Sequence, residues 1–294
     1  MKRTEPGCVP GEPRVLMESL EGVLVQIVSG GVTDMGRVRS NNEDSFRIVN
    51  PLHLFVLSDG MGGEAHGEVA SSLAVETIVK YCSQSKDDSG VTLVAESQDN
   101  WSEKTKQLQN AVRAANLSIF ESAQKHAEQR GMGATVTAAW LNEGKLSIAH
   151  VGDSRAYLLR SGSLQQLTND HSLVAEQVRR GIISRQQAEE SEMQSVLLRA
   201  LGAHTEVEVD VDETAIYSGD VLLLCSDGLT RMVTEPEIAG TLQAETNPSA
   251  AAQRLIDLAN DNGGLDNITA VVARFQDEPK GWFSWLHRGS ARKD

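Results

Sequence analysis

A short apolar segment at residues 54–57 leads to an acidic residue, Asp59, and three glycines follow within four positions, at Gly60, Gly62 and Gly63. An apolar run bounded by glycines is typical of a buried strand. A carboxylate at the end of such a strand is costly to bury unless a positive charge meets it. The sequence therefore predicts a strand that carries an aspartate into a site containing positive charge.

The same arrangement occurs again at residues 221–228, where an apolar run leads to Ser-Asp-Gly with Asp227. A single Ser-Asp-Gly is more often only a turn, with the aspartate as a cap and the glycine at positive φ. Two copies, each after an apolar run, suggest instead that both carboxylates belong to one site. Further acids stand at expected strand ends or tight turns: Glu43, Asp44, Asp153 and Asp266.

Carboxylates that converge in one place raise one another's pKa values unless cations neutralise them. Their oxygen ligands favour Mg²⁺ or Mn²⁺ over zinc, because no Cys-His pattern accompanies these acids. Two such ions roughly 3.5–4 Å apart can activate a water molecule and hold a phosphoryl group. Arg39 lies just before the first acids. Its planar guanidinium can pair with two phosphate oxygens at once.

The predicted strands and helices do not alternate as regular βαβ units, which favours an α+β layered domain. A hairpin-like turn is expected at residues 29–31, and a surface insertion at residues 83–104. Strands are expected near residues 23–28, 45–49, 54–57, 134–141, 146–151, 155–159, 207–211, 221–225 and 267–275. Helices are expected at residues 68–82 and 105–129, within the polar region 170–192, after the capping pair Thr234 and Glu237, and from Asn247 onward.

The chain has 294 residues, which is enough for one large domain or two small ones. Its formal net charge is −14. Its acidic balance argues against a nucleic-acid partner, because phosphate backbones are held by clustered Lys and Arg. Three scattered cysteines form no CxxC pair, which favours a reducing compartment. Because the sequence has no signal peptide and no apolar run that could span a membrane, we expect a cytoplasmic protein.

Six segments resemble, in this order, the motifs of the metal-dependent (PPM, type 2C) protein phosphatases: residues 39–44 (RSNNED), 58–63 (SDGMGG), 131–135 (GMGAT), 151–157 (VGDSRAY), 226–228 (SDG) and 266–269 (DNIT). The resemblance covers about residues 26–275, and the six ordered motifs make it specific. It is greatest to the bacterial branch, because residues 167–172 (LTNDHS) and 198–202 (LRALG) frame the polar helical region as they do there.

The resemblance implies an α+β fold in which two antiparallel sheets pack face to face as a sandwich, with helices outside both. It also implies that Asp59 bridges two metal ions and that the Gly60 carbonyl binds the second. Asp227 and Asp266 would complete the first ion. Asp153 would serve a third, weaker ion found in bacterial members.

By the same resemblance, Glu43 and Asp44 act on metal-bound waters and Arg39 holds the substrate phosphate. Arg39, Asp44 and Asp59 then form the catalytic set. One position departs from many eukaryotic members, because Met61 stands where they carry a histidine that protonates the leaving group. A thioether supplies no proton, so we expect a metal-bound water to take that role.

Several of these residues also have purely structural interpretations. Asp153 could be a turn residue paired with Arg155, Arg39 a surface arginine, and Glu43 a solvated neighbour of the next aspartate. Two histidines near the motifs are expected to be loop or packing residues: His66 and His171.

The expected function is hydrolysis of phosphoserine and phosphothreonine in proteins, with Mn²⁺ or Mg²⁺ as cofactor. The alternative is a catalytically silent, metal-binding regulatory module of the same fold. Expected partners are phosphorylated proteins and a Ser/Thr kinase counterpart, with no nucleic acid and no membrane span, and the chain is expected to be a monomer. We expect an N-terminal tail at residues 1–20, the catalytic domain at 21–276 and a C-terminal tail at 277–294.

Overall fold

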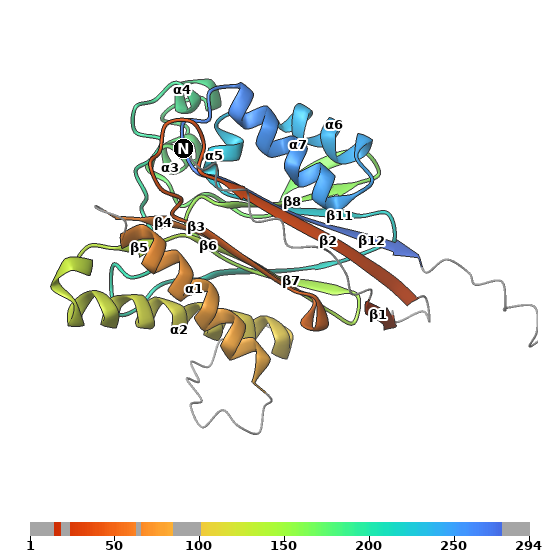
Figure 1. Cartoon of the computed structure of the whole chain (residues 1–294), viewed down its shortest axis with the longest axis horizontal. Coiled ribbons are helices and arrows are strands. Elements are labelled where there is room, and N and C mark those ends of the chain that lie inside the picture. The colour runs from red at the N-terminus through yellow and green to blue at the C-terminus, as the bar shows by residue number, and fades with distance from the viewer. Residues whose placement is uncertain (1–14, 19–23, 63–65, 85–100, 278–294) are drawn as a thin grey trace, which may run out of the picture.

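The computed structural model describes residues 15–18, 24–62, 66–84 and 101–277. Its centre is a pair of antiparallel sheets packed face to face (Figure 1). The first sheet has the order β1 (Val15–Glu18), β2 (Leu24–Asp34), β12 (Ile268–Asp277), β11 (Val221–Cys225), β8 (Arg155–Arg160) and β9 (Ser163–Gln166). The second has the order β10 (Asp210–Ala215), β7 (Lys145–Val151), β6 (Val136–Asn142), β4 (Leu54–Met61) and β3 (Asp44–Val49), with β5 (Gly133–Ala134) paired to β4.

Helices cover both outer faces of this sandwich, as Figure 1 shows. The second sheet carries α1 (His66–Ser83) and α2 (Glu103–Lys125), while the first carries α6 (Glu235–Ala244) and α7 (Pro248–Asp261). The remaining helices lie near one end of the sandwich: α3 (Leu173–Arg179), α4 (Arg185–Glu189) and α5 (Asp227–Thr230). Two short 3₁₀ turns are η1 (Asn50–Leu52) and η2 (Ala127–Gln129). The sandwich predicted from the sequence is confirmed.

Strand β4 is buried on both faces, which explains why its sequence is an unbroken apolar run rather than an alternating one. Leu54 and Val56 pack against the helical layer of α1 and α2, whereas Phe55 and Leu57 face the core between the sheets. Asp59 lies an even number of residues after Phe55 and Leu57, so its side chain is on the same face of the strand as theirs. The strand therefore directs this aspartate toward the end of the gap between the two sheets.

The turn expected at residues 29–31 is wrong, because β2 continues through Gly30 and Gly31 in full register with β12. A Cβ on Gly30 would lie 2.6 Å from the Ser249 nitrogen of α7, and one on Gly31 would lie 2.6 Å from the Phe46 ring of β3. Glycine at these positions permits close packing of other elements against the strand.

Two further sequence predictions differ from the structure. The strand expected at residues 207–211 begins instead at Asp210, because β10 pairs with β7 over Asp210–Ala215. Val209 is buried in the helical core without being part of a strand. Residues 15–18 of the predicted N-terminal tail form β1, which pairs with β2, and the rest of that tail lies outside the described residues.

The polar region 170–192 holds two short helices, α3 and α4. Most of the surface insertion predicted at residues 83–104 lies outside the described residues, as does nearly all of the predicted tail at 277–294. Within the described part of the chain, no helix is long and apolar enough to cross a membrane.

Candidate metal centre

Five aspartates carried by segments of both sheets meet at one end of the sandwich. Asp44 begins β3, Asp59 lies near the end of β4, and Asp153 follows β7. Asp227 follows β11, and Asp266 lies two residues before the start of β12. Burial, followed by repulsion from the other four carboxylates, raises the pKa of Asp59 well above its ordinary value. The site therefore gathers carboxyl groups whose charges repel one another in a partly buried place.

Strand pairing accounts for part of this convergence. Asp44 and Asp59 are directly opposite each other in the β3–β4 register. Like charges in that position are destabilising unless something between them compensates. Asp227 also lies close enough to Asp59 for their carboxyl groups to share a hydrogen bond. The three side chains thus form a compact group even though Asp44 and Asp227 are far apart in sequence.

The glycines of the two Ser-Asp-Gly motifs are needed for close approach, not for a positive φ. A Cβ on Gly60 would lie 2.7 Å from the Glu43 carbonyl oxygen and would overlap the Gly67 backbone. A Cβ on Gly228 would overlap the carbonyl of Asn267. Each glycine therefore lets its strand end press against a neighbouring segment of the site.

Asp44 is held by one oxygen only. Ser226 Oγ and Thr269 Oγ1 donate hydrogen bonds of 2.7 and 2.6 Å to Asp44 Oδ2. Asp44 Oδ1 is buried and accepts no hydrogen bond within the described residues. Burial raises the pKa of this carboxyl to about 7. The geometry leaves one buried acceptor atom, Asp44 Oδ1, without a donor from the described part of the chain.

Two arginines lie among the carboxylates. Arg39 Nη2 donates a hydrogen bond of 2.8 Å to Asp266 Oδ2, and 52% of the Arg39 side chain is exposed. Arg231 Nη2 lies 2.5 Å from Asp227 Oδ2 and 4.0 Å from Asp153 Oδ2, while its Nη1 lies 3.8 Å from Asp266 Oδ2. Arg231 was not among the residues predicted from sequence. The signal that could have found it is its i,i+4 spacing from Asp227.

Glu43 contributes to the site mainly through its backbone. Its N–H donates a 2.8 Å hydrogen bond to Asn267 Oδ1, and its carbonyl accepts one of 3.0 Å from the Gly60 N–H. The Glu43 side chain accepts a 3.2 Å hydrogen bond from Asn41. The Asn267 side chain also donates to the Asn41 carbonyl, at 2.8 Å. These contacts tie the motif at residues 39–44 to the segment that carries Asp266.

Asp153 does not pair with Arg155, so the structural interpretation of Asp153 as the partner of that arginine is wrong. Arg155 instead makes a bidentate pair with Asp170, with Nε–Oδ1 and Nη2–Oδ2 distances of 2.9 and 2.7 Å. His171 is buried, and its Nδ1 accepts a 3.0 Å hydrogen bond from the Gly152 N–H. His171 is thus a packing residue, as expected, and it also fixes the turn that carries Asp153.

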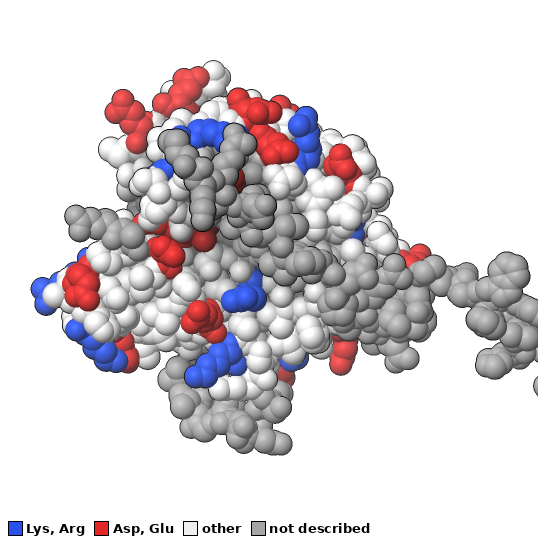
Figure 2. Space-filling model, in the orientation of Figure 1, with Lys and Arg blue, Asp and Glu red and all other residues white. Residues whose placement is uncertain are grey.

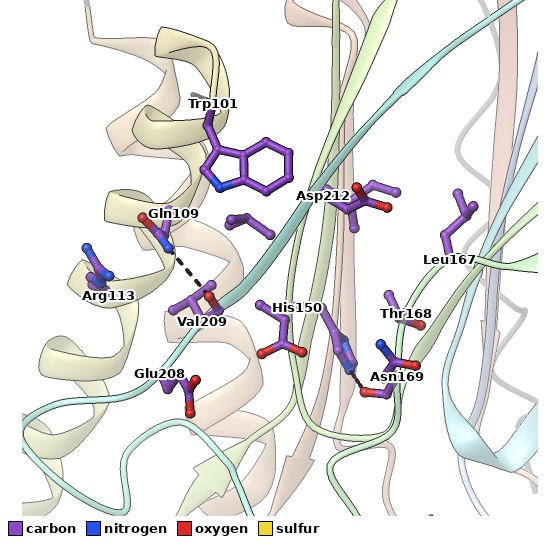
Figure 3. A pocket seen from close by; sticks show the side chains of 13 residues that line it. Trp101, Gln109, Arg113, His150, Leu167, Thr168, Asn169, Glu208, Val209 and Asp212 are labelled. Carbon is purple, nitrogen blue, oxygen red and sulfur yellow. Dashed lines mark hydrogen bonds between the residues drawn. The ribbon is translucent and has the colours of Figure 1, made fainter. Parts of the chain in front are cut away.

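A cavity of about 480 Å³ lies elsewhere, between α2, β7 and β10 (Figure 3). Its wall includes Trp101 and His150. His150 Nε2 donates to the backbone carbonyls of Gly152 and Asn169, and its Nδ1 is hydrogen-bonded to Thr137 Oγ1. None of the five aspartates lines this cavity. The hollow is therefore separate from the carboxylate cluster.

The sequence profile described as protein phosphatase 2C matches residues 36–260. This chain belongs to the protein phosphatase 2C family. Among curated relatives, serine/threonine phosphatase stp of Listeria innocua serovar 6a is 40% identical over 243 residues, which are 82% of this chain and 92% of that protein.

Solved structures of protein phosphatase 2C relatives superimpose on the same fold. The serine/threonine phosphatase PstP/Ppp of Mycobacterium tuberculosis has a TM-score of 0.75 and 36% identity, covering 85% of this chain and 99% of that one. The catalytic domain of serine threonine protein phosphatase PstP, in complex with two manganese ions, has a TM-score of 0.74 and 37% identity, covering 86% of this chain and 100% of that one. The resemblance found in the sequence is confirmed.

The carboxylate cluster of this protein phosphatase 2C chain fits hard divalent cations. Every candidate ligand is an oxygen, and Asp227 Oδ1, like Asp44 Oδ1, is buried without a hydrogen-bond partner in the described part of the chain. Burial, more than repulsion, raises the pKa of Asp227, and burial raises that of Asp153 to about 8. Bound cations would offset both the burial and the mutual repulsion of these carboxylates.

As they stand, no three Asp, Glu, His or Cys side chains of the described residues surround one point as they would surround an ion. Arg39 and Arg231 hold oxygens of Asp266 and Asp227 in this arrangement.

Proposed function

We propose that this chain is a metal-dependent protein phosphatase that hydrolyses phosphoserine and phosphothreonine in proteins, with Mn²⁺ or Mg²⁺ as cofactor. The observation that carries the proposal is the meeting of five aspartates from distant segments in a chain of the protein phosphatase 2C family. The named relatives are serine/threonine phosphatases, and one of their structures contains two manganese ions.

The residues that would hold the two core ions are Asp59, Asp227 and Asp266, together with the Gly60 carbonyl. Bound ions of this kind act as Lewis acids on a phosphoryl group and lower the pKa of water to near neutrality. Buried carboxylate oxygens without a hydrogen-bond partner among the described residues, such as Asp227 Oδ1, support this assignment. The low exposure of the cluster strengthens each electrostatic interaction within it.

The remaining residues of the site would bind and orient the substrate phosphate and a water molecule. We propose that Arg39 releases Asp266 and takes two oxygens of the substrate phosphate, because its half-exposed guanidinium can reach solvent. Asp44 Oδ1 would accept a hydrogen bond from a water molecule in the site, since its other oxygen is fixed by Ser226 and Thr269. Glu43 would support this arrangement through its backbone contacts.

The test is turnover of p-nitrophenyl phosphate and of a phosphothreonine peptide during Mn²⁺ titration, with EDTA as the metal-free control. Asp59→Asn and Asp227→Asn should each reduce kcat on the order of 10²-fold or more. Asp257→Asn, on the exposed side of α7, is the matched control and should retain wild-type turnover. Unchanged activity in either site variant would contradict the assignment. Mn²⁺ binding without any hydrolysis by the wild type would support the silent regulatory module instead.

We further propose that the chain works as a cytoplasmic monomer on proteins that a Ser/Thr kinase has phosphorylated. The described cysteines, Cys82 and Cys225, are free and buried, which supports a reducing compartment. A dimer in size-exclusion chromatography with light scattering would contradict the monomer.

A further inference from the structure

Arg231 lies inside the carboxylate cluster rather than on its rim. It directly follows α5, and its Nη2 is 2.5 Å from Asp227 Oδ2 and 4.0 Å from Asp153 Oδ2. Its Nη1 is 3.8 Å from Asp266 Oδ2. Only 26% of its side chain is exposed, half the value for Arg39. One guanidinium thus faces three of the five aspartates.

The other arginines near the cluster are engaged differently. Arg39 pairs with Asp266 on the exposed side. Arg155 comes two residues after Asp153, but its fork is occupied by both oxygens of Asp170. Arg231 is therefore the guanidinium that lies between Asp153 and the aspartates assigned to the core ions.

A guanidinium in this position excludes a further cation. It keeps its charge at every relevant pH. Its positive charge would repel a divalent ion placed in contact with Asp153, since two charges a few ångströms apart interact strongly in a partly buried site. It also supplies hydrogen-bond donors to the carboxylate oxygens that such an ion would need.

We propose that Arg231 takes the place of a third cation beside Asp153, so that this chain binds two divalent ions and uses the guanidinium as its third positive charge. The inference rests on the proposed function, because it takes Asp59, Asp227 and Asp266 as ligands of the two core ions. Arg231 is then a residue that sets how many ions the site holds and that positions Asp153 and Asp227 before ions bind.

The experiment counts bound Mn²⁺ by titration calorimetry of the metal-free full chain. Wild type should bind about two Mn²⁺ per chain. Arg231→Ala should gain a third, weaker site, and the double variant Arg231→Ala/Asp153→Asn should lose it again. Arg231→Lys, which keeps a positive charge, should remain at two. If the alanine variant fails to fold, Arg231→Gln tests the same loss of charge with a side chain of similar length.

A second measurement follows the metal-free proteins by thermal unfolding in EDTA. Arg231→Ala should have a lower Tm than Arg231→Lys, because three carboxylates lose their shared partner. Three Mn²⁺ bound to the wild type, or two bound to both Arg231→Ala and Arg231→Gln, would overturn the inference and leave the proposed function intact. A wild-type chain that binds no Mn²⁺ would overturn both.

Discussion

The two Ser-Asp-Gly strand ends share a local sequence but differ in the charges around them. The largest influences on Asp59 after burial are four other carboxylates, all of which raise its pKa. Asp227 is also buried, but Arg231 and Arg39 oppose the rise in its pKa. The comparison shows that one motif can place a carboxylate in two kinds of environment. The charge of Asp227 is opposed by arginines of the protein, while the charges that act most on Asp59 are other carboxylates.

The largest effects should come from replacing Asp59 and Asp227 in turn with asparagine, which tests the difference between their environments. Asp59→Asn should cause the larger loss of kcat, on the order of 10²- to 10³-fold, because Asp59 is expected to bridge both ions. In EDTA, without bound metal, the Asp59 variant should instead be the more stable of the two. Asp59→Asn should raise the Tm by removing repulsion, whereas Asp227→Asn should not, since it also breaks the pair with Arg231. Equal Tm shifts in the two variants would refute the proposed difference in compensation.

Phosphate binding offers a second test, on the Asp266 side of the cluster. Arg39→Ala removes charge-assisted hydrogen bonds worth about 1.5–3 kcal/mol each, so KM for a phosphoprotein should rise roughly tenfold or more. The effect on kcat should be smaller. Arg47→Ala, an exposed arginine on β3, is the matched control. A wild-type KM in the Arg39 variant would remove its role in holding phosphate.

The pH dependence of the metal-free protein tests the raised pKa values of two buried carboxyls of the cluster, Asp44 and Asp153. Asp44 and Asp153 have pKa values raised to about 7 and about 8 in the folded chain. They bind protons more tightly when folded than when unfolded, so the free energy of unfolding should fall as pH rises from about 4 to about 8. Thermal melts in EDTA at pH 5, 6.5 and 8 should therefore show a decreasing Tm. Saturating Mn²⁺ should flatten the profile, and a rising Tm without metal would contradict the assignment.

The smallest effect expected comes from the two serines of the paired motifs. Ser226→Ala removes a hydrogen bond to Asp44 and should reduce kcat severalfold, since such a bond is worth about 1 kcal/mol. Ser58 Oγ instead donates to the Thr135 backbone carbonyl rather than to a carboxylate. Ser58→Ala should lower the Tm and leave kcat near wild type. A kcat loss in Ser58→Ala as large as in Ser226→Ala would remove the distinction between the two strand ends.

Much of the fold could be predicted because strands buried on both faces leave continuous apolar runs, as at residues 54–57 and 221–225. The course of β2 could not, because Gly30 and Gly31 are required by contacts with α7 and β3, which lie elsewhere in the chain. The five aspartates could be found from their positions at strand ends and from the resemblance of ordered motifs.

Arg231 could not be assigned from sequence, because its importance depends on Asp153 and Asp266 as much as on its neighbour Asp227. A periodicity argument identifies only the i,i+4 pair, which is common on helices and usually weak. The role of Arg231 could therefore not be predicted, because it depends on contacts with aspartates from three different segments of the chain.

The carboxylates of this cluster come from both sheets: Asp44, Asp59 and Asp153 from the strands or turn of the second, Asp227 and Asp266 from the first. Ions bound by aspartates of both sheets would link the two sheets at this end of the sandwich. Loading with metal should then couple the unfolding of the two halves and protect the strand termini from amide hydrogen exchange, by a free energy that grows with the logarithm of ion concentration.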